Sequence, residues 1–539
     1  MSAKTIRAQL ASDPAVGAGN VLTTLMALDT GLDVPLITFD SAIDTHRAGE
    51  ALTVRQLDRA VRARAAALHA EGIRPRDPVA VWAGTAADHV LSFLALARLG
   101  AIPALVNPRL DPDKAVIYIG RLRAAAVLAD TERHALLAGR DTGAPLLPDL
   151  SAPATHDPAD APEPYRHWAD DPVAITHSSG TTGLPKAVVH SHASLYAAVR
   201  HRLSLPRPQG SERMLSVLPA PHAATLIAVN LALSTHAEIS LLSSQTGDAV
   251  LEAIESWQPR GVIGFATTWA DLARHDLGAR RTGSVALWWN TGDCAHEAHI
   301  RRLIAAGSRQ SVTRQGRVTL PGSVFVDGLG STEMGHSHFF ITHTPDTERY
   351  GRCVGRPHAF VDCAVLGPDG EELPAGQVGE LGTRSPTLAL GYWNDSVTTY
   401  RTRVRGYFLT GDLVYRDEEG YYYHLDRAVD AVDLGGGRRL YTAVSEEAVL
   451  AACPDILDCT FVALREDGRV VTDVLVQPRD GADPGRDWAK EVAAALPPEV
   501  AATLREVTTA ADGRIPLGPT GKVRKVLLRD RHSAQGGAR

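Results

Sequence analysis

The sequence predicts an α/β protein built from two domains, and three observations support this prediction. The chain has 539 residues, whereas a single hydrophobic core stops growing at about 250–300 residues. In the first half, helical periodicity alternates with short apolar runs, which is typical of a parallel sheet covered by helices on both faces. Beyond residue 352 the pattern changes to short strands separated by Asp-Gly and Glu-Gly turns, which favour antiparallel hairpins.

The elements of the larger, N-terminal part follow in order from these patterns. Residues 52–73 and 89–100 have the apolar spacing of helices, and an apolar segment at 223–242 continues the alternation. Strands are predicted at 78–84, 102–107, 172–176, 216–220, 261–265, 284–290 and 323–328. Hairpin strands are predicted within 361–373, 377–383 and 406–426. Residues 151–171 are rich in Pro, Ala and Asp, so they are expected to form a surface connection.

The C-terminal part predicts a small α+β domain. Helices are expected at 445–453 and 488–496, and strands at 459–466 and 470–477. About 110 residues suffice for such a domain. We therefore place a large domain at residues 1–428 and a small one at 429–539.

Composition excludes several classes of protein. The net charge is -7 and no basic run is interleaved with aromatic residues, so nucleic acid is not an expected partner. No signal-peptide pattern and no long uncharged apolar run is present, which predicts a cytoplasmic protein without membrane insertion. Five cysteines without regular spacing indicate reduced core residues. Only six of the 55 basic residues are lysines.

One of these lysines ends the strongest local motif, THSSGTTGLPKAVVHSH at 176–192. Small residues with free backbone N–H groups and hydroxyls, placed after a strand, can surround phosphate oxygens. The spacing does not match a Walker A motif, and a flexible turn is the alternative interpretation. The candidate phosphate-binding residues are Thr176, Ser178, Ser179, Gly180, Thr181, Thr182, Gly183 and Lys186.

Further motifs follow in a fixed order: LPAPH at 218–222, NTGDC at 290–294, GLGSTE at 328–333, YFLTGD at 407–412, LDR at 425–427 and IPLGPTGKV at 515–523. Together with the phosphate loop they resemble the adenylate-forming (ANL) superfamily, which contains acyl-CoA synthetases, peptide-synthetase adenylation domains and firefly luciferase. The resemblance implies two packed βα sheets plus a distorted β-barrel, and a mobile small domain. It also implies ATP, Mg²⁺ and coenzyme A as cofactors.

The same resemblance assigns roles to individual residues. Glu333 and Thr181 are implied in binding Mg²⁺, Asp412 and Arg427 in binding the ribose, and Lys522 in catalysis. The remaining implied contacts to nucleotide or to reacting groups are Gly292, Asp293, Gly328, Leu329, Gly330, Ser331, Thr332 and His222. These types suit the chemistry, because joining an acid to the α-phosphate of ATP requires neutralised charge and fixed geometry. The neighbouring histidines do not have transition-metal spacing.

Two departures from the family pattern bear on the reaction. Leu329 stands where relatives usually have an aromatic residue, so adenine stacking is lost. After Arg427, Val429 occupies the hinge position and Asp433 the place of a lysine. One hypothesis is that these are neutral substitutions in an exposed loop, without effect on the reaction. The other is that adenylation survives while transfer to coenzyme A is impaired and a separate partner completes it.

A pocket for the acid is predicted to involve His222, Ala223, Trp269, Trp289, Asn290, Gly330, Met334 and Gly335. Their mixture of small and bulky apolar side chains favours a bulky hydrophobic carboxylic acid. The resemblance further suggests a natural-product ligase for a platensimycin-type diterpenoid acid. The sequence thus predicts an acid:CoA ligase. The alternatives are an acyl-AMP ligase that loads a carrier protein and an inactive nucleotide-binding scaffold.

Overall fold

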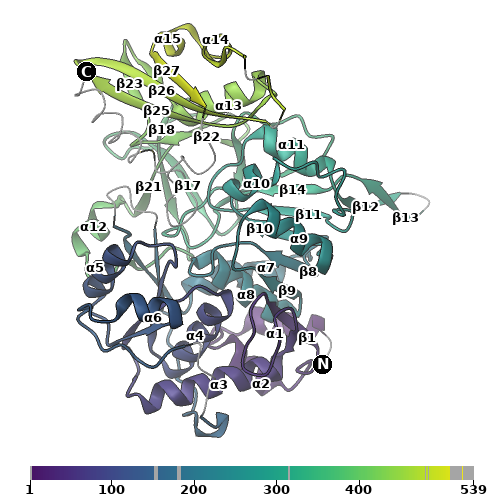
Figure 1. Cartoon of the computed structure of the whole chain (residues 1–539), viewed down its shortest axis with the longest axis vertical. Helices are drawn as coiled ribbons and strands as arrows, with labels where there is room; N and C mark the ends of the chain where they lie inside the picture. The colour runs from purple at the N-terminus through teal and green to yellow at the C-terminus, as the bar shows by residue number, and fades with distance from the viewer. Residues whose placement is uncertain are drawn as a thin grey trace.

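A six-stranded sheet forms one layer of the N-terminal part (Figure 1). The computed structural model describes residues 3–150, 156–178, 184–313, 316–479, 481–483, 485–509 and 525. The order of strands across the sheet is β19 (Gly391–Tyr392), β7 (Ala187–Ser191), β6 (Pro172–His177), β4 (Ile102–Val106), β3 (Pro78–Trp82) and β5 (Ala126–Ala129). Strands β3 to β6 pair in parallel, as the βα alternation predicts. The helices of this segment are α3 (Val54–Ala70), α4 (Ala86–Leu99), α5 (Pro112–Leu122) and α6 (Thr131–Leu137).

A second sheet has a parallel half that follows the same pattern. Its strands are β1 (Pro35–Phe39), β9 (Glu238–Leu241), β8 (Arg213–Ser216), β10 (Gly261–Gly264), β11 (Leu287–Asn290) and β14 (Val324–Asp327), with β2 (Ala51–Thr53) at the edge. Its helices are α7 (Ser194–Ser204), α8 (Ala223–Thr235), α9 (Gly247–Trp257), α10 (Ala266–Leu272) and α11 (Glu297–Ala305). The apolar segment 223–242 is therefore a helix followed by a strand.

The two sheets share one core that is filled by helices. A single cluster contains buried residues of β3, α4, α8 and β9. Every residue of α4 except Asp88 is buried, and a helix that is apolar all round belongs in such an interior. The N-terminal helices α1 (Ala3–Ser12) and α2 (Val21–Leu28) pack on α7 and α8. Helix α1 thus covers α7 and α8 on the side of the N-terminus.

Beyond β14 the second sheet continues as an antiparallel extension, which contains the hairpin strands predicted within 361–373, 377–383 and 406–426. The strands of the extension are β15 (Phe339–His343), β16 (Cys353–Pro357), β22 (Tyr422–Arg427), β21 (Tyr407–Arg416), β18 (Gly379–Arg384), β17 (Asp362–Leu366) and β20 (Arg403–Val404). The short helices α12 (Ser396–Arg401) and η1 (Pro158–Asp160) lie outside the sheets. A separate hairpin, β12 (Ser308–Thr313) and β13 (Gly316–Pro321), projects from the molecule (Figure 1).

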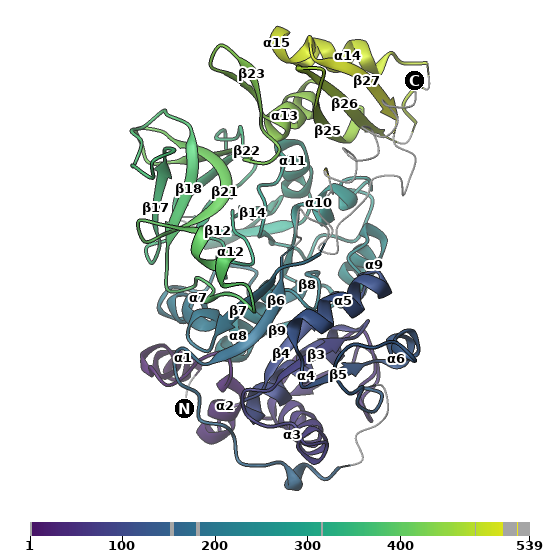
Figure 2. The ribbon, with the colours of Figure 1, turned by 90° about the vertical axis from the view of Figure 1, so that its left-hand side faces the viewer.

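The C-terminal elements lie at one end of the long axis (Figure 2). They are β23 (Val432–Gly435), β24 (Arg438–Leu440), α13 (Thr442–Ala452), β25 (Ile456–Glu466), β26 (Arg469–Pro478), α14 (Trp488–Ala495), α15 (Pro498–Ala501) and β27 (Leu504–Thr509). Strands β25, β26 and β27 form a sheet of their own. The predicted class, a large α/β part with a small α+β part, is confirmed. The boundary between residues 428 and 429 stays a prediction.

A partly buried ion pair connects the N-cap of α11 in the large part to α13 in the small part, and its two side chains are 16% and 13% exposed. Nδ1 of His296 lies 2.6 Å from Oε2 of Glu447, and the Glu297 N–H donates to the other oxygen at 3.0 Å. Burial opposes both charges, but the hydrogen bond and mutual attraction outweigh it. They raise the pKa of His296 and lower that of Glu447 to about 2. The pair therefore fixes how the two parts meet.

The stability from this pair is expected to depend on pH. Because the folded-state pKa of His296 is raised, its contribution is complete below the ordinary pKa of 6.5 and is lost as pH rises through the raised value. The Glu447 contribution is lost only as pH falls toward about 2. Replacing His296 by Gln should cost about 3 kcal/mol near pH 6, the low end for breaking a buried pair.

Thermal unfolding between pH 6 and pH 9 measures this dependence. The wild type should lose stability with rising pH more steeply than His296→Gln. The double variant with Glu447→Gln should lose little beyond the single variants. Equal pH slopes in wild type and variant would contradict the assignment.

Candidate active site

The turn before α8 positions His222 beside Thr332. His222 is the N-cap of the helix, and its Nδ1 accepts the Ala224 N–H at 3.1 Å. In the neutral imidazole the proton therefore resides on Nε2, which lies 3.3 Å from Oγ1 of Thr332. Two residues from distant motifs thus meet, and the ring has a fixed donor at this end of the helix.

Glu333 is held by a tyrosine that also contacts the phosphate-loop lysine. The Tyr392 hydroxyl donates to Oε1 of Glu333 at 3.0 Å, and Nζ of Lys186 lies 5.2 Å from the centre of the Tyr392 ring. Burial and the negative charge of Glu333 raise the pKa of Tyr392, so the phenol stays protonated and remains a donor. The structure therefore brings Lys186 and Glu333 together around one aromatic ring.

Magnesium is the cation that this carboxylate would suit. Among the described residues no group of three or more His, Cys, Asp and Glu side chains could hold a metal ion. A single carboxylate fits Mg²⁺, which commonly takes its other ligands from phosphates and water. Glu333 would hold the ion, which supplies positive charge next to the phosphates.

The predicted ribose residues form an ion pair. Arg427 Nη1 donates to Oδ1 of Asp412 at 2.9 Å, and Nε2 of His424 lies 3.4 Å from the same oxygen. Burial opposes ionisation of Asp412, but the charge of Arg427 and the contact with His424 prevail and lower its pKa to about 2. Asp412 is therefore a carboxylate acceptor at neutral pH. The negative charges of Glu333 and Asp293 also raise the pKa of Arg427. The four charged groups Arg427, Asp412, Glu333 and Asp293 therefore interact within one region.

The two loops that follow β11 and β14 are bonded to each other. The Gly330 N–H donates to the carbonyl of Gly292 at 3.0 Å. A Cβ on Gly330 would approach the carbonyl of His336 to 2.8 Å, so only glycine allows this approach. The carboxylate of Asp327 accepts hydrogen bonds from Asn290 and Ala295. Asp327 therefore anchors the loop that begins at β11.

Several predicted site residues lie in the interior instead. The Thr176 hydroxyl is buried and bonded to Nε2 of His190 at 2.9 Å. Leu329 is 2% exposed and packs in the core of the antiparallel strands, which leaves it little surface for adenine. Trp269 is also a core residue. Its ring N–H is satisfied there, because Nε1 donates to Oδ1 of Asn290 at 2.8 Å. Met334 is fully buried.

The predicted positions 179–183 and 522 lie outside the described residues. The ends of the phosphate loop are described, and the Ser178 N–H donates to the Lys186 carbonyl at 3.1 Å. Ser178 and Lys186 therefore lie side by side, next to the ends of β6 and β7. The roles assigned to residues 179–183 in phosphate binding and to Lys522 in catalysis stay predictions.

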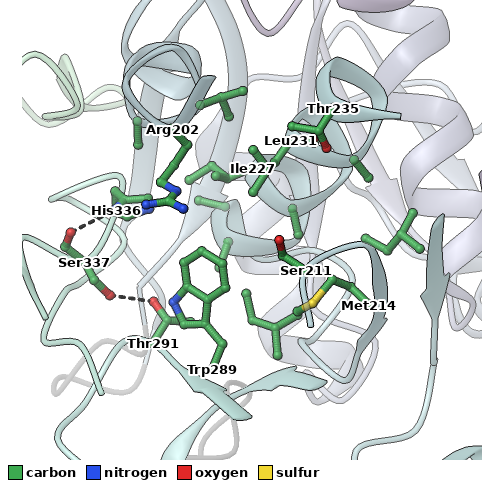
Figure 3. Close-up of a pocket in the computed structure, with 18 of the residues that line it drawn as sticks. Arg202, Ser211, Met214, Ile227, Leu231, Thr235, Trp289, Thr291, His336 and Ser337 are labelled. Carbon is green, nitrogen blue, oxygen red and sulfur yellow. Dashed lines mark hydrogen bonds between the residues drawn. The ribbon is translucent and has the colours of Figure 1, made fainter. Parts of the chain in front are cut away.

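A large pocket extends along α8 from His222 (Figure 3). It contains about 1140 Å³ of space that no atom fills, its opening to solvent included. One face of α8 lines it, namely Ala223, Ala224, Ile227, Ala228, Leu231, Ala232 and Thr235. Twelve residue steps of helix correspond to about 18 Å, so the pocket is long. Of the predicted acid-binding residues it contains His222, Ala223, Trp289, Gly330 and Gly335, whereas Trp269, Asn290 and Met334 do not line it.

The pocket also contains polar residues outside the eight that are predicted for the acid. Arg202 and His336 face it, together with Thr291 and Ser337, whose hydroxyls are 2.8 Å apart (Figure 3). Tyr392 and Asp327 were missed as well. Tyr392 belongs to a GYW sequence at 391–393 that could have indicated it. No sequence pattern points to Arg202, because it lies on a different element from every predicted motif.

Together with the fold, this arrangement is that of enzymes that form adenylates from ATP. The chain belongs to the family of AMP-binding enzymes, whose model matches residues 36–393. It is 42% identical to a 3-aminoavenalumate diazotase of Streptomyces sp over 98% of each chain. It is 29% identical to a feruloyl-CoA synthase of Amycolatopsis sp over 91% of this chain and 96% of that one.

Solved structures share the fold. A crystal structure of the anthranilate CoA ligase AuaEII in complex with anthranoyl-AMP aligns with a TM-score of 0.81 at 20% identity, covering 99% of this chain and 100% of that one. None of these three relatives is named as a diterpenoid acid ligase, so the expectation of one is not supported. No helix of the described residues is long and apolar enough to cross a membrane.

Proposed function

We propose that the chain is an ATP-dependent diazotase that converts the amine of an amino-substituted aromatic acid into a diazonium group. The similarity to a 3-aminoavenalumate diazotase over nearly the full length supports this activity. The acid that is adenylated is then nitrite, and the aromatic amine is the acceptor. This replaces the expected transfer of an acyl group to coenzyme A.

The proposed reaction has three steps. An oxygen of nitrite attacks the α-phosphorus of ATP and pyrophosphate leaves, which gives a nitrosyl adenylate. The aromatic amine attacks the nitrosyl nitrogen, so that AMP leaves with the bridging oxygen and the amine loses a proton. The N-nitrosamine then tautomerises to a diazohydroxide and loses hydroxide to form the diazonium ion. No external oxidant or reductant is consumed.

The residues of this chain would act mainly by holding charge. Asp412 offers a carboxylate acceptor to the ribose hydroxyls and is kept ionised by Arg427. Glu333 would hold Mg²⁺ beside the phosphates. The donor on Nε2 of His222 faces the same region as Thr332, where negative charge on the reacting oxygens needs stabilising.

The structural observation that carries the proposal is the loop that would accept a thiol. In the related acyl-CoA synthetases this loop lines the route of the acceptor after the small domain turns. Here it is the β23–β24 hairpin, with Asp433 exposed and three consecutive glycines in left-handed conformations at its tip. Val429 at the hinge is 56% exposed. The hairpin therefore has no lysine at the place where the related acyl-CoA synthetases have one, and its own cations, Arg438 and Arg439, lie on the second strand.

Nitrite dependence tests the proposal. The enzyme is incubated with ATP, Mg²⁺, 3-aminoavenalumate and ¹⁵N-nitrite, and pyrophosphate release and azo coupling of the product to a naphthol are measured. We expect both signals only when nitrite is present, with ¹⁵N in the azo dye. Parallel reactions contain coenzyme A or a holo carrier protein without nitrite.

A second candidate is the carboxylic acid:CoA ligase that the sequence predicts, which the similarity to a feruloyl-CoA synthase supports. Efficient formation of an acyl thioester without nitrite, and no azo dye with it, would overturn the diazotase proposal. Pyrophosphate release that leads neither to a thioester nor to an azo dye would indicate an adenylating enzyme that depends on a partner, and no release at all would indicate an inactive scaffold. Either outcome would also contradict the diazotase proposal.

A further inference from the structure

Arg202 is a cation on the wall of a mainly apolar pocket. It belongs to α7, and its side chain reaches into the pocket near Ile227 and His336 (Figure 3). Burial, followed by the positive charge of Arg7, lowers the pKa of Arg202. The guanidinium still carries its charge at neutral pH, because an arginine cannot be deprotonated in this range.

The contacts of Arg202 within the protein do not compensate this charge. Its one hydrogen bond, from Nη2 to the Pro206 carbonyl, is 3.5 Å long. None of the carboxylates in the described part of the chain forms an ion pair with it, and Arg7 adds repulsion. A partly buried cation without an anionic partner is costly. The position is therefore one that an anionic ligand would stabilise.

Arg7 and Arg207 also line the pocket, but each has another role. Arg7 donates to the carbonyls of Leu203 and Leu205 at the end of α7, and Arg207 donates to the carbonyl of Thr235 at the end of α8. Arginines commonly satisfy the last carbonyls of helices in this way. Arg202 makes only the long bond to the Pro206 carbonyl, so most of the donors of its guanidinium are left for a ligand.

His336 beside Arg202 offers an acceptor and no second positive charge. Its Nδ1 lies 2.6 Å from the Ser337 carbonyl and therefore donates to it. Burial, with smaller effects of Arg202 and His201, lowers the pKa of His336 to about 4, so the ring is neutral at pH 7. Nε2 then carries a lone pair, and the positive charge of this region resides on Arg202.

The position of Arg202 separates it from the reacting group. Ile227, which lies close to Arg202 in Figure 3, follows His222 by five residues of α8, a rise of about 7.5 Å. A ligand group at Arg202 therefore lies toward the part of the pocket lined by Ile227, about one helical turn along α8 from His222. In the proposed reaction it is then not the group that is joined to the α-phosphate.

We infer that Arg202 binds the carboxylate of an amino-substituted aromatic acid, which then lies with its amine toward Thr332 and its carboxylate inside the pocket. This orientation is opposite to that needed for acyl adenylation, and the inference rests on the proposed diazotase function. A guanidinium and a carboxylate form a bidentate, charge-assisted pair. Arg202 would thus decide which end of the acid reacts.

Binding of an acid and its ester tests this orientation without nitrite or ATP. The dissociation constants of 3-aminoavenalumate and its methyl ester are measured by calorimetry for the wild type, Arg202→Met and Arg202→Lys. The wild type should prefer the acid by about tenfold or more, which corresponds to one strong charged pair. Arg202→Met keeps the apolar stem and should bind both compounds equally. Arg202→Lys should retain part of the preference.

Arg207→Met is the matched control, since Arg207 also lines the pocket but is bonded to the end of α8. The inference is overturned if the wild type binds the ester as tightly as the acid. It is equally overturned if only Arg207→Met abolishes the preference. Because this experiment contains no nitrite, its failure leaves the diazotase reaction standing, and a failed diazotase assay leaves the measured preference intact.

Discussion

Replacing Lys522 by alanine is expected to slow adenylate formation by about 10²-fold or more, the scale of losing one preorganised charge-stabilising donor. Lys522 lies beyond the described residues, and this expectation comes from its motif. A lysine on a glycine-rich loop can place a compact positive charge beside the α-phosphate only when the small domain closes. Single-turnover release of pyrophosphate measures the step directly. A rate within about twofold of wild type would contradict the assignment.

Two other lysines of the same region separate this effect from general damage. Lys490 is exposed on α14, so Lys490→Ala should leave the rate unchanged. Lys525 is partly buried and donates to Glu446 and Thr442, both at 2.7 Å. Lys525→Ala leaves Glu446 without its cation and should lower the melting temperature. A drop in rate without loss of stability is therefore the signature of Lys522 alone.

Replacing Glu333 by Gln should reduce pyrophosphate release by about 10²-fold, because the substitution removes the negative charge that would hold Mg²⁺. The side chain keeps its size, so the packing against Tyr392 is preserved. The defect should be partly relieved by raising the Mg²⁺ concentration. Initial rates across a magnesium titration test both statements.

Tyr392→Phe is the matched variant for this prediction. It removes only the hydroxyl that donates to Glu333 at 3.0 Å, a hydrogen bond to a charged group worth about 1.5–3 kcal/mol. Its rate should therefore fall by about tenfold and depend on magnesium in the same direction. If Glu333→Gln had a smaller effect than Tyr392→Phe, Glu333 would not be the metal-binding carboxylate.

The pattern of the sequence predicted the elements well where it was strongly periodic. The helix expected at 52–73 is α3 after a short strand, and the hairpin expected within 406–426 is β21 and β22. The long apolar segment 223–242 gave no such answer, because a buried helix and a buried strand are equally apolar. Its division into α8 and β9 depends on which neighbours cover each part.

The acid pocket shows the limit of sequence reasoning more sharply. The sequence predicts both Trp269 and Trp289 for the acid pocket. In the structure only Trp289 faces this pocket. Trp269 turns inward, where its ring N–H is satisfied by Asn290. Which side of an element faces a ligand depends on packing against elements far away in the chain.

By itself the sequence determined the family, and it predicted the charged groups for the nucleotide, because the motifs around Lys186, Glu333 and Asp412 are local and keep a fixed spacing. Only the tertiary structure decided the surroundings of the acid. Helix α7 brings Arg202 to the face of α8, and strand β19 brings Tyr392 to Glu333. Such pairs are separated by tens of residues or more, so their meeting follows from how the sheets and helices pack and not from any local pattern.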